Sequence, residues 1–183
     1  MAHISSAAAV LSGVVRGLRP GQLTNPTPCT EFDVRALVHH LLYWGPSLAG
    51  AGRKELVEPS EVDTSDWRPA LLAVVSGIEK SWSSPGSSEG TTRMGGPTEL
   101  PAALVADMVL GELTVHAWDL ARATGQPFEV PEDLLTHLYD GVVAHAAEAR
   151  AMGVYGPEVP VPASASTLDR ILGLTGRDPA WSR

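Results

Sequence analysis

Apolar residues recur every three to four positions along six segments of the chain, a spacing that predicts helices and not strands. Clusters of glycine and proline separate these segments and mark the connections between helices. We expect an all-α fold in which the first four helices form a bundle, with an additional helix and an extended C-terminal tail packed against it. The predicted helices span residues 4–18, 31–44, 66–82, 101–124, 131–152 and 166–174.

The ends of these helices and two of the connections carry their own signals. Thr30 is the candidate N-cap of the second helix, and Pro131 suits the first position of the fifth. Gly125 is expected to stop the fourth helix. The Ser/Gly-rich stretch 83–97 is long for a bundle connection, so a crossover, a short hairpin and a mobile lid all remain open. The proline-rich stretch 156–162 is expected to lie extended.

Three ionisable residues of the fourth helix, Glu112, His116 and Asp119, fall within its apolar stripe when successive residues are placed 100° apart. Burying them together is costly unless they form an internal hydrogen-bond network or bind a metal ion. Glu112 and His116 are four residues apart and can reach one ion, and Asp119 can orient the His116 ring from outside the ligand set. The surrounding apolar positions are Val105, Met108, Val109, Val115 and Ala123, and the opposite sector holds Asp107, Thr114 and Trp118.

A third ligand has to come from another helix, and the second helix offers two adjacent histidines. His40 borders the apolar face of that helix, whereas His39 points almost opposite to it and toward solvent. By helical position alone, a half-buried boundary histidine is the favoured interpretation of His40. His145 lies on the apolar stripe of the fifth helix and is expected in the core, and His137 and His3 are expected on the surface.

Composition narrows the class of protein further. The chain has 183 residues, which fits a single domain over residues 1–183, and its net charge of −8 gives no electrostatic footprint for nucleic acid or an anionic membrane. Apolar runs stop well short of the ~20 residues of a membrane span, and no signal peptide is visible, so we expect a cytoplasmic protein.

The single cysteine, Cys29, excludes an internal disulfide. Cys29 precedes a helix N-terminus, where a thiol pKa can be lowered, but it has no evident base partner and a structural role is expected.

Three separated motifs resemble a known family. The stretch from Thr27 to Leu41 resembles the T-P-C-x-[WF]-x-V-x-x-L-x-x-H-L signature of actinobacterial mycothiol-dependent enzymes, and Glu112 to Ala121 resembles their E-x-x-x-H-x-W-D-L-A segment. Residues 156–162, 168–170 and 176–181 resemble the tail of an uncharacterised metal-binding branch related to the N-terminal domain of mycothiol-dependent maleylpyruvate isomerase. These proteins belong to the DinB/YfiT-like superfamily of four-helix bundles, so the resemblance implies that fold.

The resemblance also implies a site. The metal ligands of the family fall on His40, Glu112 and His116, and zinc is the first expectation, with nickel, manganese or iron as alternatives. The implied cosubstrate is mycothiol or another low-molecular-weight thiol, which a divalent ion activates for S-transfer to an electrophile or for thiol-assisted isomerisation. We expect the open side of the ion to face a pocket lined by Trp44 and Met108, open toward residues 83–100.

Two other functions remain open at this stage. The chain could be a non-catalytic protein that binds a metal or a small ligand, such as a sensor or stress protein, because helix-lined pockets suit both. It could also be a structural dimer with a vestigial site, which predicts no bound metal. Its expected partners are a small-molecule thiol and an electrophile, and it is expected to be a monomer or a homodimer.

Overall fold

The computed structural model describes residues 2–183, and it confirms the all-α prediction. The described chain contains six α-helices, a 3₁₀ turn at Pro20–Gln22 and a two-stranded antiparallel hairpin. The helices are α1 (Ala2–Gly17), α2 (Val34–Gly52), α3 (Trp67–Trp82), α4 (Ala102–Thr124), α5 (Glu132–Ala151) and α6 (Thr167–Leu174), and the strands are β1 (Thr91–Arg93) and β2 (Glu99–Pro101).

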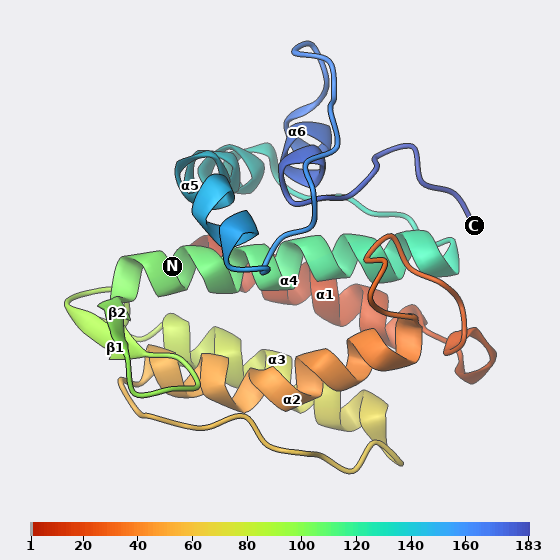
Figure 1. Ribbon diagram of the computed structural model, residues 1–183. Helices are drawn as coiled ribbons and strands as arrows, with labels where there is room; N and C mark the ends of the chain where they lie inside the picture. Colours follow the sequence, from red (N-terminus) through yellow and green to blue (C-terminus); the bar gives the residue numbers. More distant parts are fainter. Residues whose placement is uncertain (1) are drawn as a thin grey trace.

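The first four helices form the predicted bundle. In this bundle α1 packs against α3 and α4, and α2 packs against the same two helices from the other side. Figure 1 shows that α1 and α4 run in one direction and α2 and α3 in the other. The connection 53–66 therefore returns along the length of α2 before α3 begins, and the β1–β2 hairpin joins α3 to α4 (Figure 1).

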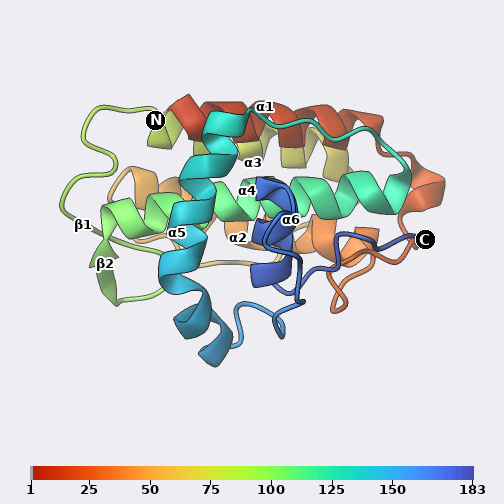
Figure 2. The same cartoon turned by 90° about the horizontal axis from the view of Figure 1, so that it is seen from above.

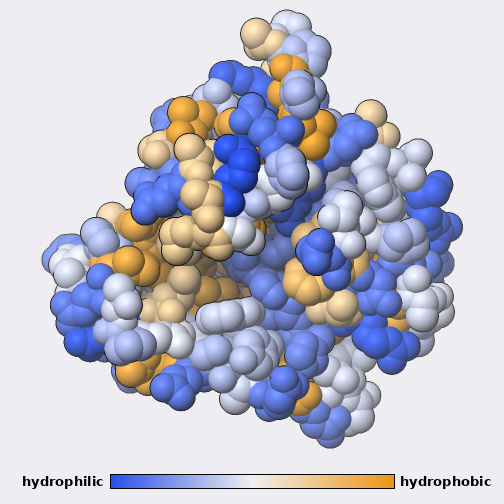
Figure 3. All heavy atoms as spheres, viewed as in Figure 1, coloured by the Kyte–Doolittle hydropathy of each residue, from blue (hydrophilic) through white to orange (hydrophobic). Residues whose placement is uncertain are grey.

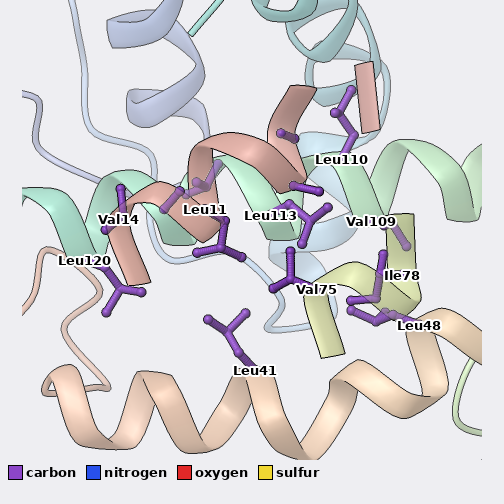
Figure 4. Packing of buried hydrophobic residues seen from close by; sticks show 14 of the residues in the cluster. Leu11, Val14, Leu41, Leu48, Val75, Ile78, Val109, Leu110, Leu113 and Leu120 are labelled. Carbon is purple, nitrogen blue, oxygen red and sulfur yellow. The ribbon is translucent and has the colours of Figure 1, made fainter. Parts of the chain in front are cut away.

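The core lies between these four helices, as Figure 4 shows for side chains such as Leu11, Leu41, Val75 and Leu113. Each of these four side chains is almost completely buried. Burial of an aliphatic side chain of this size contributes roughly 1.5–3 kcal/mol, so the apolar stripes are the main source of the bundle's stability.

Helix α4 is buried on nearly all sides, which the sequence analysis did not predict. Thr114 and Trp118, placed opposite the buried face by helical position, are only 1% and 4% exposed. The reason is the second layer of structure, because α5 packs across α4 and α6 packs on α5 (Figure 2). The expectation that the fifth helix and the tail pack against the bundle is confirmed.

Two predicted helix boundaries are wrong. Helix α2 begins at Val34, not at residue 31, because the side chain of Asp33 accepts a hydrogen bond from the amide of Ala36 at 2.7 Å and acts as the N-cap instead of Thr30. The same helix continues past Pro46 to Gly52, where a break after residue 44 was expected. Its last two turns are buried in the bundle, and this packing outweighs the hydrogen bond that proline removes.

Other boundaries agree more closely with the sequence. Gly125 ends α4 with a φ of 69°, in the left-handed region that glycine adopts without strain. Pro131 stands one residue before α5 and not inside its first turn. Of the three possibilities for residues 83–97, the structure contains the short hairpin, in which Thr92 lies opposite Leu100.

The surface is mixed in character. Hydrophilic and apolar residues form small interspersed groups over the face shown in Figure 3. Among residues 2–183, the helices are all too short or too polar to cross a membrane.

Candidate metal centre

Side chains from α2 and α4 converge at one point of the bundle. His40 Nε2 lies 2.7 Å from Glu112 Oε1, and His116 Nε2 lies 3.6 Å from the same oxygen. The possible ligand atoms of these three residues all lie within 4.8 Å of one another. In the part of the chain that the structure describes, they are the one group of three or more such side chains close enough to share a metal ion.

The helix geometry of α2 selects His40 over its neighbour, as helical position predicts. His40 is half-buried, with its ring centroid 5.1 Å from Phe32 and 5.2 Å from His116. The adjacent His39 points away from this cluster to the returning connection 53–66, where its Nε2 lies 3.1 Å from Glu61 Oε2. The two imidazoles therefore have different polar partners, Glu61 for His39 and Glu112 for His40, although they are consecutive in sequence.

Asp119 makes the contact with His116 that the spacing predicts. Its carboxylate has no exposed surface, and Oδ2 lies 2.9 Å from His116 Nδ1. A carboxylate can only accept at this distance, so His116 Nδ1 carries the hydrogen. The other ring nitrogen, Nε2, faces Glu112, and this is the arrangement of a metal-binding histidine with its outer partner.

Arg177, from the C-terminal segment, is a further member of the cluster that the sequence did not predict. Its guanidinium donates from Nη2 to Asp119 Oδ2 at 3.1 Å and from Nε to Asp119 Oδ1 at 3.5 Å. Arg177 is buried, at 7% exposure. Residues 176–181 were noted only as part of a tail motif. The available signal was Asp119 itself, because a carboxylate predicted to be buried needs a cation from somewhere.

The surroundings keep Glu112 ionised. Burial by itself raises the pKa of this carboxyl group, but the charge of His116, the hydrogen bond from His40 and the charge of Arg177 outweigh that effect. Together they lower the pKa of Glu112 from 4.5 to about 2. At neutral pH the cluster therefore presents an anionic oxygen between two imidazoles, which suits a divalent cation.

Cys29 lies close enough to this cluster to sense its charges. Burial raises the pKa of the Cys29 thiol above its ordinary value, and although Arg177 acts in the opposite direction, Asp119 and Glu112 add to the rise. The lowering that the nearby helix N-terminus can produce is thus overcome. The thiol stays protonated at neutral pH, which favours a structural role for Cys29.

A cavity of about 610 Å³ adjoins the cluster, and His40 forms part of its wall. It lies between α2 and the connection 53–66. The expected lining by Trp44 and Met108 is wrong, because Gly95 of the hairpin packs so tightly on the Trp44 ring that a Cβ there would lie 2.7 Å from it. The lining residues are Phe32, Asp33, Arg35, Ala36, His39, His40, Tyr43, Glu61 and Thr64.

The remaining histidines lie apart from the cluster. His145 is exposed, so its predicted core position is wrong; α5 buries only a narrow face, and the residue on that face is the neighbouring Ala146. His137 is on the surface as predicted and pairs with Asp107 at 3.1 Å. His3 is partly exposed and stacks on His137, with 4.9 Å between ring centroids.

Comparisons with known proteins agree with this architecture. Uncharacterized proteins from two strains of Mycobacterium tuberculosis are each 25% identical over 180 residues, covering 97% of this chain and 96% of theirs. The crystal structure of the mycothiol-dependent maleylpyruvate isomerase matches with a TM-score of 0.60 at 15% identity, over 81% of this chain and 70% of the other, which shows a shared fold. The family model of the mycothiol maleylpyruvate isomerase N-terminal domain matches residues 4–121, a range that includes nearly all of α1, all of α2 and α3, nearly all of α4, and the three converging side chains. The chain therefore belongs to the mycothiol maleylpyruvate isomerase N-terminal domain family.

Proposed function

We propose that the protein binds one divalent metal ion through His40, Glu112 and His116 and uses a low-molecular-weight thiol, mycothiol, in S-transfer or thiol-assisted isomerisation. The observation that carries the metal is the convergence of two imidazoles and one ionised carboxylate within 4.8 Å. Two histidines and a carboxylate form a known ligand set of catalytic zinc, and nickel, manganese and iron also accept it. The thiol is inferred from the family and from the isomerase that shares the fold.

The hydrogen bonding within the cluster supports a metal over a self-contained polar network. His40 Nε2 is close enough to Glu112 for a hydrogen bond, but His116 Nε2, at 3.6 Å, is not. Among residues 2–183, His116 Nε2 has no other hydrogen-bond partner, although its side chain is only 9% exposed. A ring nitrogen of a largely buried imidazole that faces an anionic oxygen without a hydrogen bond to it fits a site in which a cation lies between the two.

The chemistry of such a centre follows from its open coordination. His40, Glu112 and His116 would hold the ion with room for a further ligand, and a divalent ion there would lower the pKa of a bound thiol, so that thiolate would be supplied at neutral pH. Asp119 holds the His116 ring, and Glu112 supplies charge. The cavity beside His40 lets a small molecule approach the cluster from the side of this histidine. Burial raises the pKa of the protein's own thiol, Cys29, which disfavours Cys29 as the nucleophile.

The first test is metal content. Elemental analysis of the untagged, purified protein should find one divalent ion per chain, and His116→Ala should abolish stoichiometric binding while circular dichroism retains the helical signal. His39→Ala is the matched control, because His39 is a neighbouring histidine that contacts Glu61 and not the cluster. Equal metal content in wild type and His116→Ala would place the site elsewhere.

The second test is turnover. The metal-loaded protein should join mycothiol to an electrophile such as monochlorobimane faster than the uncatalysed reaction, and His116→Ala should lose this activity. A wild type that binds metal at these residues but turns over no thiol would instead support the non-catalytic metal-binding protein.

A further inference from the structure

We infer that Arg177 is a positioning residue for the metal centre: from the C-terminal segment it fixes Asp119, which in turn fixes the ring of His116. This inference rests on the proposed function, because it assigns Arg177 a part in the same site. It goes beyond that function by making the segment after α6 necessary for the geometry of the ligands.

The first step is the continuity of the contacts. Arg177 Nη2 lies 3.1 Å from Asp119 Oδ2, and that oxygen lies 2.9 Å from His116 Nδ1. Arg177 Nε approaches the other carboxylate oxygen at 3.5 Å. A planar guanidinium that meets both oxygens sets the plane of the carboxylate, whereas a single point contact leaves it free to rotate. The orientation of Asp119 is thereby transmitted to the imidazole of His116.

The second step is the burial of the pair. Asp119 has no exposed side-chain surface and Arg177 has 9%, so neither charge is solvated well enough to stand alone. Within residues 2–183, Arg177 is the one lysine or arginine that contacts Asp119. Removing the guanidinium would leave the carboxylate without its cation, and the carboxylate would be expected to change its position or admit water.

The third step is how Arg177 itself is held. Its Nη1 donates to the carbonyl oxygen of Thr175 at 2.7 Å, and its amide donates to Leu172 O at the end of α6 at 2.8 Å. Gly176, with a φ of +82°, packs so closely on Gly156 that a Cβ there would lie 2.8 Å from the Gly156 Cα. The guanidinium is therefore placed by α6 and by the tight chain reversal before it, and not by Asp119 alone.

These contacts couple two distant parts of the chain. If the docked tail orients His116 for a metal, then a bound metal favours the docked tail by the same factor, because coupling between two equilibria is reciprocal. We therefore expect added zinc to slow hydrogen exchange of the Arg177 amide. The amide of Val154, at the end of α5, is the internal reference; it donates to Ala149 O and lies outside this chain of contacts.

The test compares three variants by zinc affinity, with a chromophoric chelator as competitor. Arg177→Gln should weaken zinc binding by about tenfold or more, within the range typical of residues that orient metal ligands. Arg177→Lys keeps the positive charge but not the planar guanidinium that meets both carboxylate oxygens, so it should retain part of the zinc affinity that Arg177→Gln loses. The matched control is Arg150→Gln, since Arg150 also binds the end of α6, through Leu174 O, without touching Asp119.

A double-mutant cycle and a spectroscopic signal distinguish a specific effect of Arg177 on the His116 ring from a general destabilisation of the fold. Asp119→Asn should weaken zinc binding, and adding Arg177→Gln to it should cost little more. In the metal-free protein, ¹⁵N spectra of His116 should show the Nδ1–H tautomer in the wild type and a mixture in Arg177→Gln. Unchanged zinc affinity in Arg177→Gln, an equal loss in Arg150→Gln, or additive losses in the cycle would overturn the inference.

The two proposals fail in different ways. A wild type that binds no zinc contradicts the proposed function, whereas the metal-free His116 spectrum still measures what Arg177 does to the ring. If the wild type binds zinc but Arg177→Gln changes neither the zinc affinity nor the His116 spectrum, only the role of Arg177 is contradicted.

Discussion

At the scale of single residues, the centre depends on an acid that stays charged in a poorly solvated place. Glu112 has 24% of its side chain exposed, and its charge is held by two imidazoles and by the more distant Arg177. Its pKa of about 2 lies below the ordinary value of 4.5, so the folded protein binds this proton less tightly than the unfolded chain does. The ionised group therefore stabilises the fold wherever it is fully charged.

This predicts a pH dependence that one substitution removes. The contribution of Glu112 is present in full above pH ~4.5 and is lost as pH falls toward the folded pKa of about 2. In the metal-free protein, urea unfolding should show a stability that declines over this window in the wild type and declines less in Glu112→Gln. Glu129→Gln is the control, because Glu129 is exposed and should follow the wild type. An identical decline of the unfolding free energy at acid pH in wild type and Glu112→Gln would contradict the prediction.

At the scale of elements, α2 and α3 approach each other closely enough to require a glycine. A Cβ at Gly45 would lie 2.1 Å from Cγ1 of Val74 on α3, closer than any normal contact. Gly45 is also the residue that made the sequence analysis end the helix, since glycine followed by proline usually marks a break. In the structure it serves helix packing, and the helix continues.

Substitution of this glycine should therefore destabilise the bundle. We expect Gly45→Ala to cost about 1–2 kcal/mol of unfolding free energy, because overpacking outweighs the gain of about 1 kcal/mol in helix propensity. The double variant Gly45→Ala/Val74→Ala should recover part of the lost unfolding free energy, because it removes the Val74 methyl group that the new Cβ meets.

Gly77→Ala on α3 is the matched control for this change. A Cβ at Gly77 meets nothing within 4 Å, so this substitution should leave stability unchanged or raise it by up to about 1 kcal/mol. Chemical denaturation of the four proteins measures the difference, and a Gly45→Ala variant as stable as Gly77→Ala would refute the close contact.

At the scale of the whole molecule, the proposed metal joins α2 to α4. His40 lies on one helix and Glu112 and His116 on the other, so an ion held by all three binds the folded chain and not the unfolded one. Its binding free energy then adds to the stability of the bundle.

Thermal unfolding should report this link. Zinc at 100 times its dissociation constant adds about 2.7 kcal/mol, which for a protein of this size raises Tm by roughly 5–10 °C. His116→Ala should melt at the same temperature with and without zinc, and His39→Ala should respond as the wild type does. A wild-type Tm that zinc leaves unchanged would show that the ion does not bridge the two helices.

Local sequence determined the helices and the part of the candidate metal centre that lies on α4. The spacing of apolar residues predicted all six helices because burial of a stripe depends on residues within a few turns. Glu112, His116 and Asp119 could be grouped for the same reason, since one helix fixes their relative positions. Helical position alone predicted His40 to be a boundary residue of the core. Its assignment as a metal ligand came from the resemblance to the family.

Only the tertiary structure decided the features that depend on distant segments. Arg177 reaches Asp119 across 58 residues of sequence, and no periodicity relates the two. The cavity lies under the connection 53–66 because that segment returns along α2, and the hairpin packs on Trp44 and fills the side where the cavity was expected. Residues within one helix have positions set by its own backbone, whereas contacts between segments depend on how the whole chain packs.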